Sequence, residues 1–141
     1  MKSLTVLSER ADVPQLRALS EHEATQPVVL IGFQKQGNLG VGYLAATLKR
    51  RGHPVKVLDF EDPPEQILAA IEGERPVLVG FSLIFQFYLP RFRTLMRYLR
   101  DHDINCHFTI GGHFPSLSHE RTLQLIPEVD SVVRFEGEVT L

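Results

Sequence analysis

From residue 28 onward, short apolar runs alternate with longer amphipathic stretches, and this alternation constrains the fold more than any other feature of the chain. The run 28–33 has no polar side chain and is rich in β-branched residues, which is typical of a strand buried on both faces of a parallel sheet. The stretch 41–51 has apolar residues at helical spacing and ends at Gly52, a common helix stop. Strand and helix patterns that alternate in this way predict parallel strands joined by right-handed crossovers.

The pattern predicts five strands and four helices. The expected strands are 28–33, 55–59, 77–81, 105–110 and 130–134, and the expected helices are 41–51, Pro63 or Pro64 to Gly73, 91–102 and 118–126. Five such units favour an α/β fold with an open, flavodoxin-like (Rossmann-like) parallel sheet, strand order 2-1-3-4-5, and helices on both faces.

Apolar spacing also predicts which helix residues face the sheet. They are Tyr43, Leu44, Thr47 and Leu48 in the first helix, Ile67, Leu68 and Ile71 in the second, Phe92, Leu95, Met96 and Leu99 in the third, and Leu123 and Ile126 in the fourth.

Residues 1–26 precede this pattern, and we interpret them as an N-terminal extension of an α/β domain at 27–141. Leu4, Val6 and Leu7 fit a short strand or a cap, and the weakly patterned residues 14–23 fit one or two helical turns. Because chain termini are often loosely held, we expect a loosely docked arm.

Composition limits the function classes. The net charge is −2 and the Lys and Arg residues are scattered, which argues against nucleic-acid binding. The single cysteine, Cys106, excludes an internal disulfide and a cysteine-only metal or iron–sulfur site, and it fits a reducing compartment. Neither a signal peptide nor an apolar run long enough to span a membrane is present. We therefore expect a soluble, cytoplasmic protein.

The candidate site lies in the loops that follow the expected strands, because open parallel sheets bind ligands at the carboxyl ends of their strands. These loops are 34–40, 82–89, 111–117 and 135–139. Gly111-Gly112 lets the backbone approach a bulky ligand without an intervening side chain. Loop 82–89 carries three aromatic and three aliphatic residues, which either pack in the core or form an apolar surface for a large flat ligand or a partner domain.

Nucleotide and metal sites find little support. Gly37, Gly40 and Gly42 follow the order G-x-x-G-x-G rather than that of a dinucleotide or phosphate loop. Loop 34–40 contains no Ser or Thr to hold a flavin phosphate. His113 and His119 lack accompanying carboxylates or cysteines that would complete a metal site.

Four segments resemble the cobalamin-binding domain that precedes the radical SAM domain in cobalamin-dependent radical SAM enzymes. They are Gly40–Ala46, Ser82–Ile84, Gly111–Pro115 and Glu136–Glu138, so that the resemblance covers roughly residues 27–141. Related cobalamin-binding domains carry D-x-H-x-x-G, S-x-L and G-G motifs. Gly40 matches the last glycine of the first motif, and Ser82 and Gly111-Gly112 match the other two.

The first motif departs strongly from the family pattern. Lys35 stands where the aspartate would be, and Gly37 stands where the cobalt-ligating histidine would be. The resemblance therefore implies a corrinoid without a lower histidine ligand from this motif, as is common in the radical SAM branch.

The resemblance also implies the residues around the nucleotide tail and corrin amides. These are Gly37, Asn38, Gly40, Ser82, Leu83, Ile84, Gly111, Gly112, His113, Glu136 and Gly137. No residue of this chain is expected to be catalytic or to ligate a metal. S-adenosylmethionine and the 4Fe-4S cluster belong to the radical SAM domain, whose three-cysteine motif one cysteine cannot supply. We therefore expect a non-catalytic N-terminal fragment whose partner is that C-terminal domain, with neither a nucleic acid nor a membrane as partner.

Two other functions stay open at this point. One is a protein-interaction domain of the same fold without a cofactor, which would use the apolar loop 82–89. The other is a flavin- or nucleotide-binding flavodoxin-like domain.

Overall fold

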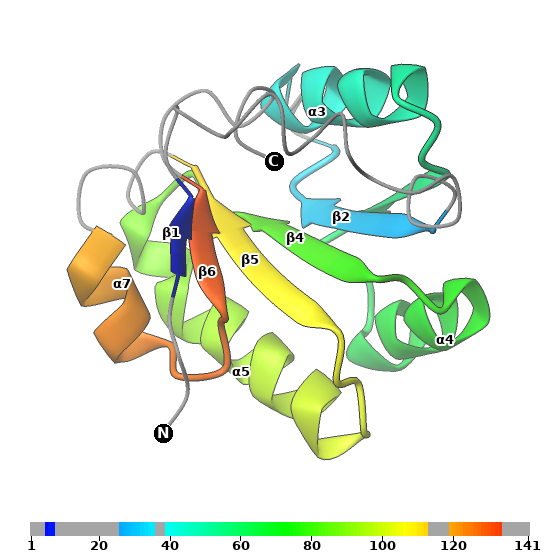
Figure 1. The fold of residues 1–141 in the computed structure, drawn as a ribbon. Helices are drawn as coiled ribbons and strands as arrows, with labels where there is room; N and C mark the ends of the chain where they lie inside the picture. Colours follow the sequence, from blue (N-terminus) through cyan, green and yellow to red (C-terminus); the bar gives the residue numbers. More distant parts are fainter. Residues whose placement is uncertain (1–4, 8–25, 36–38, 113–118, 134–141) are drawn as a thin grey trace.

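The computed structural model describes residues 5–7, 26–35, 39–112 and 119–133, which form an α/β fold around one parallel sheet (Figure 1). The strands are β1 (Thr5–Leu7), β2 (Val28–Gly32), β3 (Val55–Asp59), β4 (Leu78–Ser82), β5 (His107–Gly111) and β6 (Ser131–Val133). The helices are α3 (Leu39–Arg50), α4 (Pro64–Glu74), α5 (Leu89–Asp101) and α7 (His119–Leu125), with a 3₁₀ turn, η1 (Gln86–Tyr88), before α5.

The sheet confirms the predicted topology and extends it by one strand. Its order is β1-β6-β5-β4-β2-β3, so strands β2 to β6 follow the predicted order 2-1-3-4-5. Strand β1 confirms the short strand expected near the N-terminus, and it pairs parallel to β6 with Thr5 beside Ser131. The sheet therefore has six strands rather than the five expected.

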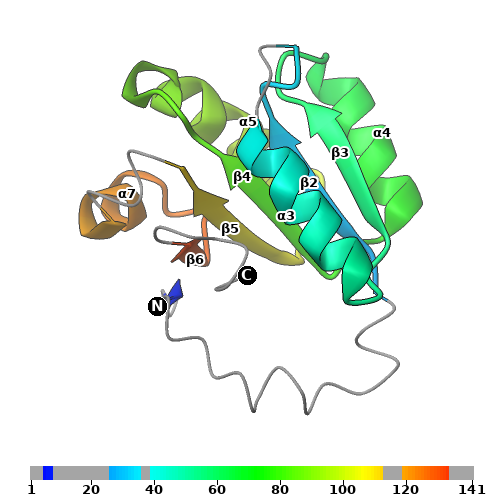
Figure 2. The same ribbon diagram turned by 90° about the horizontal axis from the view of Figure 1, so that it is seen from above.

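Helices cover both faces of the sheet, as predicted. Figure 1 shows α3 on one face and α4, α5 and α7 on the other, and Figure 2 shows the same arrangement from above. The larger core lies on the three-helix face, where Phe60 and Phe92 stack with ring centroids 4.0 Å apart. The core under α3 is smaller and holds Val28 and Leu30 of β2.

The predicted inward face of α3 was wrong in part. Tyr43 is 67% exposed, whereas Val41, Ala45 and Leu48 are buried against the sheet. These three residues are spaced by four and three positions, which is the stripe that one helix face presents. The predicted inward residues of α5 and α7 are all buried, together with Ile67 and Ile71 of α4.

Arg100 fastens the amino-end side of the sheet, away from the candidate site. Its guanidinium donates to the carbonyl oxygens of Ile104 and Cys106, each at 2.9 Å. It also donates to the carbonyl of Glu128 at 3.0 Å and to the carboxylate of Asp130 at 2.8 Å. The same group lies 3.6 Å from the centroid of the Phe108 ring. One side chain thereby joins α5 to the segments that lead into β5 and β6.

Candidate functional site

The carboxyl ends of the strands form one edge of the sheet, and the described candidate residues gather there. Ser82, the last residue of β4, pairs with Gly111, the last residue of β5. Helix α3 starts at this edge after the loop that follows β2, and it carries the exposed Gly40 in its first turn. Ile84 is half-buried two residues beyond the end of β4. Candidate residues Gly37, Asn38, His113, Glu136 and Gly137 lie outside the described residues.

The loops after β4 and β5 contact each other through their backbones. The Leu83 N–H donates to the Gly111 carbonyl oxygen at 2.8 Å. Gly112 has a φ of +126°, and a Cβ there would lie 2.1 Å from the Leu83 carbonyl oxygen. Gly112 is therefore required by close packing within the chain, whereas the sequence pattern had suggested room for a ligand.

Gly111 differs from its neighbour. A Cβ at Gly111 would meet Val133 at 3.5–3.6 Å, an ordinary contact distance, and its φ is not positive. The fold itself does not demand glycine at this position. Leu83, another candidate, is fully buried in the larger core. Its side chain therefore packs beneath the edge and is not exposed to a ligand there.

A row of polar side chains that the sequence pattern did not predict runs from the amino end of β5 to its middle. The Ser131 hydroxyl donates to the Thr109 hydroxyl at 2.8 Å, and the latter donates to the Ser131 carbonyl at 3.3 Å. His107 Nε2 lies 2.8 Å from the Ser131 hydroxyl oxygen. Thr109 also pairs with Gly80, whose added Cβ would meet Leu30 of the α3 core at 2.8 Å. These polar groups thus lie on the α3 face, and they satisfy one another.

Asp59 ties two loops together at the end of β3. Its carboxylate accepts the Lys35 N–H at 3.3 Å and the Glu61 N–H at 2.8 Å. Asp59 is buried, so its charge is compensated by these backbone donors, as buried carboxylates require. The first residues of the loop after β2 are therefore held against the end of β3.

The apolar loop after β4 divides between core and surface. Phe85 is 46% exposed and Phe87 is 71% exposed, and we call these two residues the aromatic ledge. Their rings stack with centroids 5.6 Å apart and an interplanar angle of 16°. The core-packing interpretation thus holds for Leu83, and the surface interpretation holds for the ledge.

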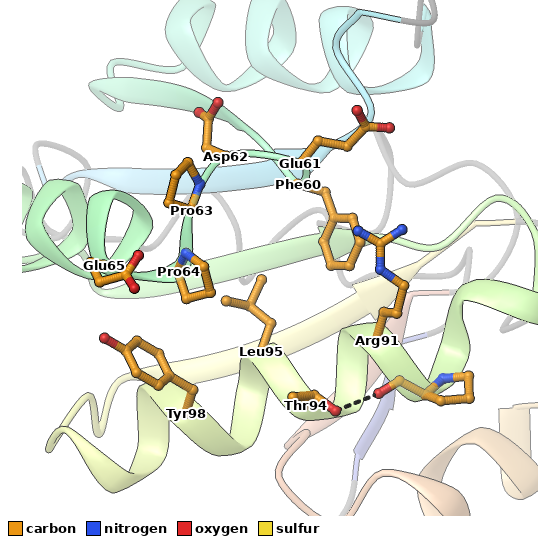
Figure 3. A pocket seen from close by; sticks show the side chains of 11 residues that line it. Phe60, Glu61, Asp62, Pro63, Pro64, Glu65, Arg91, Thr94, Leu95 and Tyr98 are labelled. Atoms are coloured by element: carbon orange, nitrogen blue, oxygen red, sulfur yellow. Dashed lines mark hydrogen bonds between the residues drawn. The ribbon is translucent and has the colours of Figure 1, made fainter.

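A cavity of about 500 Å³ opens between the loop after β3 and helix α5 (Figure 3). Apolar groups line it together with polar ones; it is bounded by Phe60, Glu61, Asp62, Pro63, Pro64, Glu65, Pro90, Arg91, Thr94, Leu95 and Tyr98. This volume is in the range of drug-sized ligands, and a corrinoid with its nucleotide tail is much larger. The cavity is therefore not the place for a whole corrinoid.

Neither a metal site nor a membrane span is found in the described part of the chain. There, no group of three or more His, Cys, Asp and Glu side chains is placed to hold a metal ion. No helix among the described residues is long and apolar enough to cross a bilayer. Cys106 is half-buried, and burial raises the pKa of its thiol, with an opposing effect from the nearby Arg100.

Solved structures share this fold. A cobalamin-binding protein from Desulfitobacterium hafniense superimposes with a TM-score of 0.68 at 18% identity, over 81% of this chain and 55% of that one. The cobalamin-dependent S-adenosylmethionine radical enzyme OxsB superimposes with a TM-score of 0.63 at 21% identity, over 81% of this chain and 17% of that one. At such identities the likeness establishes the fold alone.

Sequence comparison gives the family. The hopanoid C-3 methylase of Methylococcus capsulatus is 28% identical over 113 residues, and the match covers 75% of this chain. The chain spans 21% of that relative's length. The family model for the B12 binding domain matches residues 33–141, which begin directly after β2 and include strands β3 to β6. The chain therefore belongs to the B12 binding domain family.

Proposed function

We propose that this chain binds cobalamin at the carboxyl edge of its sheet, as the cobalamin-binding part of a cobalamin-dependent radical SAM enzyme. The observation that carries the proposal is the joined edge at Leu83 and Gly111-Gly112, where the S-x-L and G-G positions of the B12 binding domain family meet. The radical SAM relatives, of which the chain spans a small part, support a separate catalytic domain as its partner.

The described edge suits cobalamin chemically. Cobalamin is a large, flat, apolar ring that carries amide side chains and a nucleotide tail, so its site must combine close backbone approach with hydrogen-bonding groups. Gly40, Ser82 and Gly111 are small residues, so backbone donors and acceptors at the edge are accessible to a ligand. A Cβ at Gly111 would make only an ordinary contact with Val133, so the packing of the chain does not by itself explain a glycine there. When bound, cobalamin supplies a cobalt centre for methyl transfer or radical chemistry. The chain's residues hold and orient it.

We further propose that no histidine of the D-x-H-x-x-G position ligates the lower face of the corrin, because Gly37 occupies that position. Three of the four described histidines lie elsewhere, towards the amino ends of the strands; the fourth, His119, is the first residue of α7. His53 Nδ1 lies 3.2 Å from the Gln26 carbonyl oxygen, and His102 Nδ1 lies 2.7 Å from the Tyr98 carbonyl oxygen. His107 is bonded to the Ser131 hydroxyl. None of these three is placed at the edge.

The test is a visible absorption spectrum after incubation with hydroxocobalamin and desalting. We expect a retained corrin band at one equivalent, weakened in Gly111→Val while far-UV circular dichroism stays unchanged. A folded, colourless protein at micromolar cobalamin would overturn the proposal. Electron paramagnetic resonance of the reduced, Co(II) form tests the lower face: incorporation of ¹⁵N-histidine should leave the spectrum unchanged, and a ¹⁵N-dependent splitting would show a histidine ligand.

A second candidate function is a cofactor-free interaction domain, favoured by the exposed aromatic ledge. On this hypothesis, Phe85→Ser or Phe87→Ser disrupts association with a partner protein without changing any absorption spectrum. A folded protein that retains no corrin and loses partner association in these variants would favour this function.

A further inference from the structure

We infer that the aromatic ledge, Phe85 and Phe87, packs against the corrin macrocycle itself and contributes affinity independent of the nucleotide tail. The inference rests on the proposed cobalamin function. It adds a contact surface for the corrin ring, formed by two residues that lie outside the three sequence motifs. It also chooses between the two surface roles that the sequence leaves open for loop 82–89, namely contact with a large flat ligand and contact with a partner domain.

The first argument is where apolar surface is exposed. Among the described residues, four large hydrophobic side chains are exposed, namely Tyr43, Val77, Phe85 and Phe87. Val77 precedes β4 at the opposite end of the sheet, whereas the two ledge residues lie together just beyond the carboxyl end of β4. Adjacent exposed phenylalanines are unfavourable in water, and such patches commonly mark binding sites.

The second argument is rigidity. The Phe87 ring lies 4.4 Å from the Tyr88 ring, and Tyr88 lies 4.6 Å from Phe33 (centroid distances). Phe33 is 1% exposed and belongs to the main core. A continuous series of rings therefore anchors the ledge, and η1 fixes its backbone. A preorganised surface loses little conformational entropy when a rigid ring packs on it.

The third argument is continuity with the edge. Leu83, two residues before Phe85, donates its N–H to Gly111 at 2.8 Å, so the ledge is fixed relative to the turn proposed to meet the cofactor. The ledge carries no charge, because only Gln86 separates its two phenylalanines. An uncharged aromatic surface suits a macrocycle whose side chains are neutral amides.

The size of the ledge favours a ring over a protein. Given about 150–250 Å² per phenylalanine side chain, exposures of 46% and 71% leave roughly 200 Å² open. Stable protein interfaces bury about 800 Å² on each partner. The ledge alone is too small for such an interface, but it matches part of one face of a macrocycle.

The test compares two ligands and three variants. Cobinamide carries the corrin ring without the nucleotide tail, so its affinity reports on ring contacts alone. In Phe85→Ala/Phe87→Ala we expect the Kd values for hydroxocobalamin and cobinamide to rise by the same factor, on the order of tenfold or more for the lost apolar contact. Gly111→Val should raise the Kd for cobalamin and leave that for cobinamide unchanged. The matched control is Val77→Ala, which removes exposed apolar surface at the other end of β4 and should change neither Kd.

The outcomes separate the inference from the function on which it rests. If the wild type retains no cobalamin, the proposed function fails, and the inference fails with it. If the wild type binds cobalamin and the ledge variant binds both ligands as tightly, the inference alone is overturned. A wild type that binds cobalamin but not cobinamide, or a ledge variant that weakens only cobalamin, overturns it too. Should the double variant misfold, Phe87→Ala, at the more exposed position, takes its place with the same criteria.

Discussion

The two adjacent glycines at the end of β5 should differ strongly in how much stability an added methyl group costs. Gly112→Ala adds a Cβ 2.1 Å from the Leu83 carbonyl oxygen and 2.7 Å from its carbonyl carbon. Both contacts are with backbone, so no side chain can move aside. Gly111→Ala adds the same atom at 3.5 Å or more from its neighbours. The two alanine variants therefore compare a clash that pushes two backbone segments apart with an ordinary van der Waals contact.

The expected loss at Gly112 has two parts. A non-glycine residue at a φ of +126° stores about 1–3 kcal/mol of strain. Relieving the clash moves the loop and breaks the Leu83–Gly111 hydrogen bond, which costs about 1 kcal/mol more. We expect the free energy of unfolding to fall by ~3 kcal/mol in Gly112→Ala. In Gly111→Ala we expect a change below ~1 kcal/mol, because reduced entropy of the unfolded chain offsets any small crowding.

Urea denaturation followed by far-UV circular dichroism measures both variants, since the chain contains no tryptophan for fluorescence. A loss of ~3 kcal/mol corresponds to a fall in Tm of about 6–12 °C for a domain near this size. The reasoning is refuted if the two alanine variants have equal stability, or if Gly111→Ala is the less stable one. Either result would mean that the loop after β5 does not lie against Leu83 as described.

Two further predictions concern the amino-end side of the sheet. Arg100→Met should lower the free energy of unfolding by ~3 kcal/mol, because it removes the charged partner of Asp130 and the side-chain donor to three carbonyls, and leaves the Asp130 carboxylate with the Phe108 N–H. The control Arg97→Met removes a side chain that is 56% exposed in its ion pair with Glu128 and should cost less than ~1 kcal/mol. Equal losses in urea denaturation would contradict the network. Because burial raises the thiol pKa of Cys106, its neutral form is favoured on folding: stability is kept at pH values below the thiol pKa of the unfolded chain and falls as pH rises towards the folded value. Iodoacetamide at pH 8 should therefore alkylate the folded protein more slowly than the urea-unfolded protein, and equal rates would refute the effect.

The sequence predicts the sheet well because its central strands are buried on both faces. Runs such as Val28–Gly32 must be apolar throughout, so they can be recognised as strands without knowing which strands pair with them. Strand β1 is harder to predict: it has three residues, and its partner β6 lies more than a hundred residues along the chain. A local sequence pattern cannot predict a pairing between segments so far apart.

The face of α3 was mispredicted for a specific physical reason. The small core on that side accepts Ala45 as a buried residue, whereas hydrophobic periodicity gives more weight to a tyrosine than to an alanine. Tyr43 was therefore assigned to the core, and the structure exposes it. The sequence does not predict the turn η1, because three residues are too few to show a helical period.

Contacts between distant backbone segments explain what the sequence could not show at the site. The G-G pattern indicates that two side chains are absent, but it does not say what approaches each position. At Gly112 the approaching group is Leu83, about thirty residues earlier in the chain, and at Gly111 nothing comes closer than 3.5 Å. The fold therefore requires glycine at position 112, whereas it would accept a Cβ at position 111 in ordinary contact. A substitution at Gly112 that abolishes cobalamin binding would report on folding. Of the two glycines, Gly111 is therefore the one whose substitution tests recognition of the cofactor, together with the ledge.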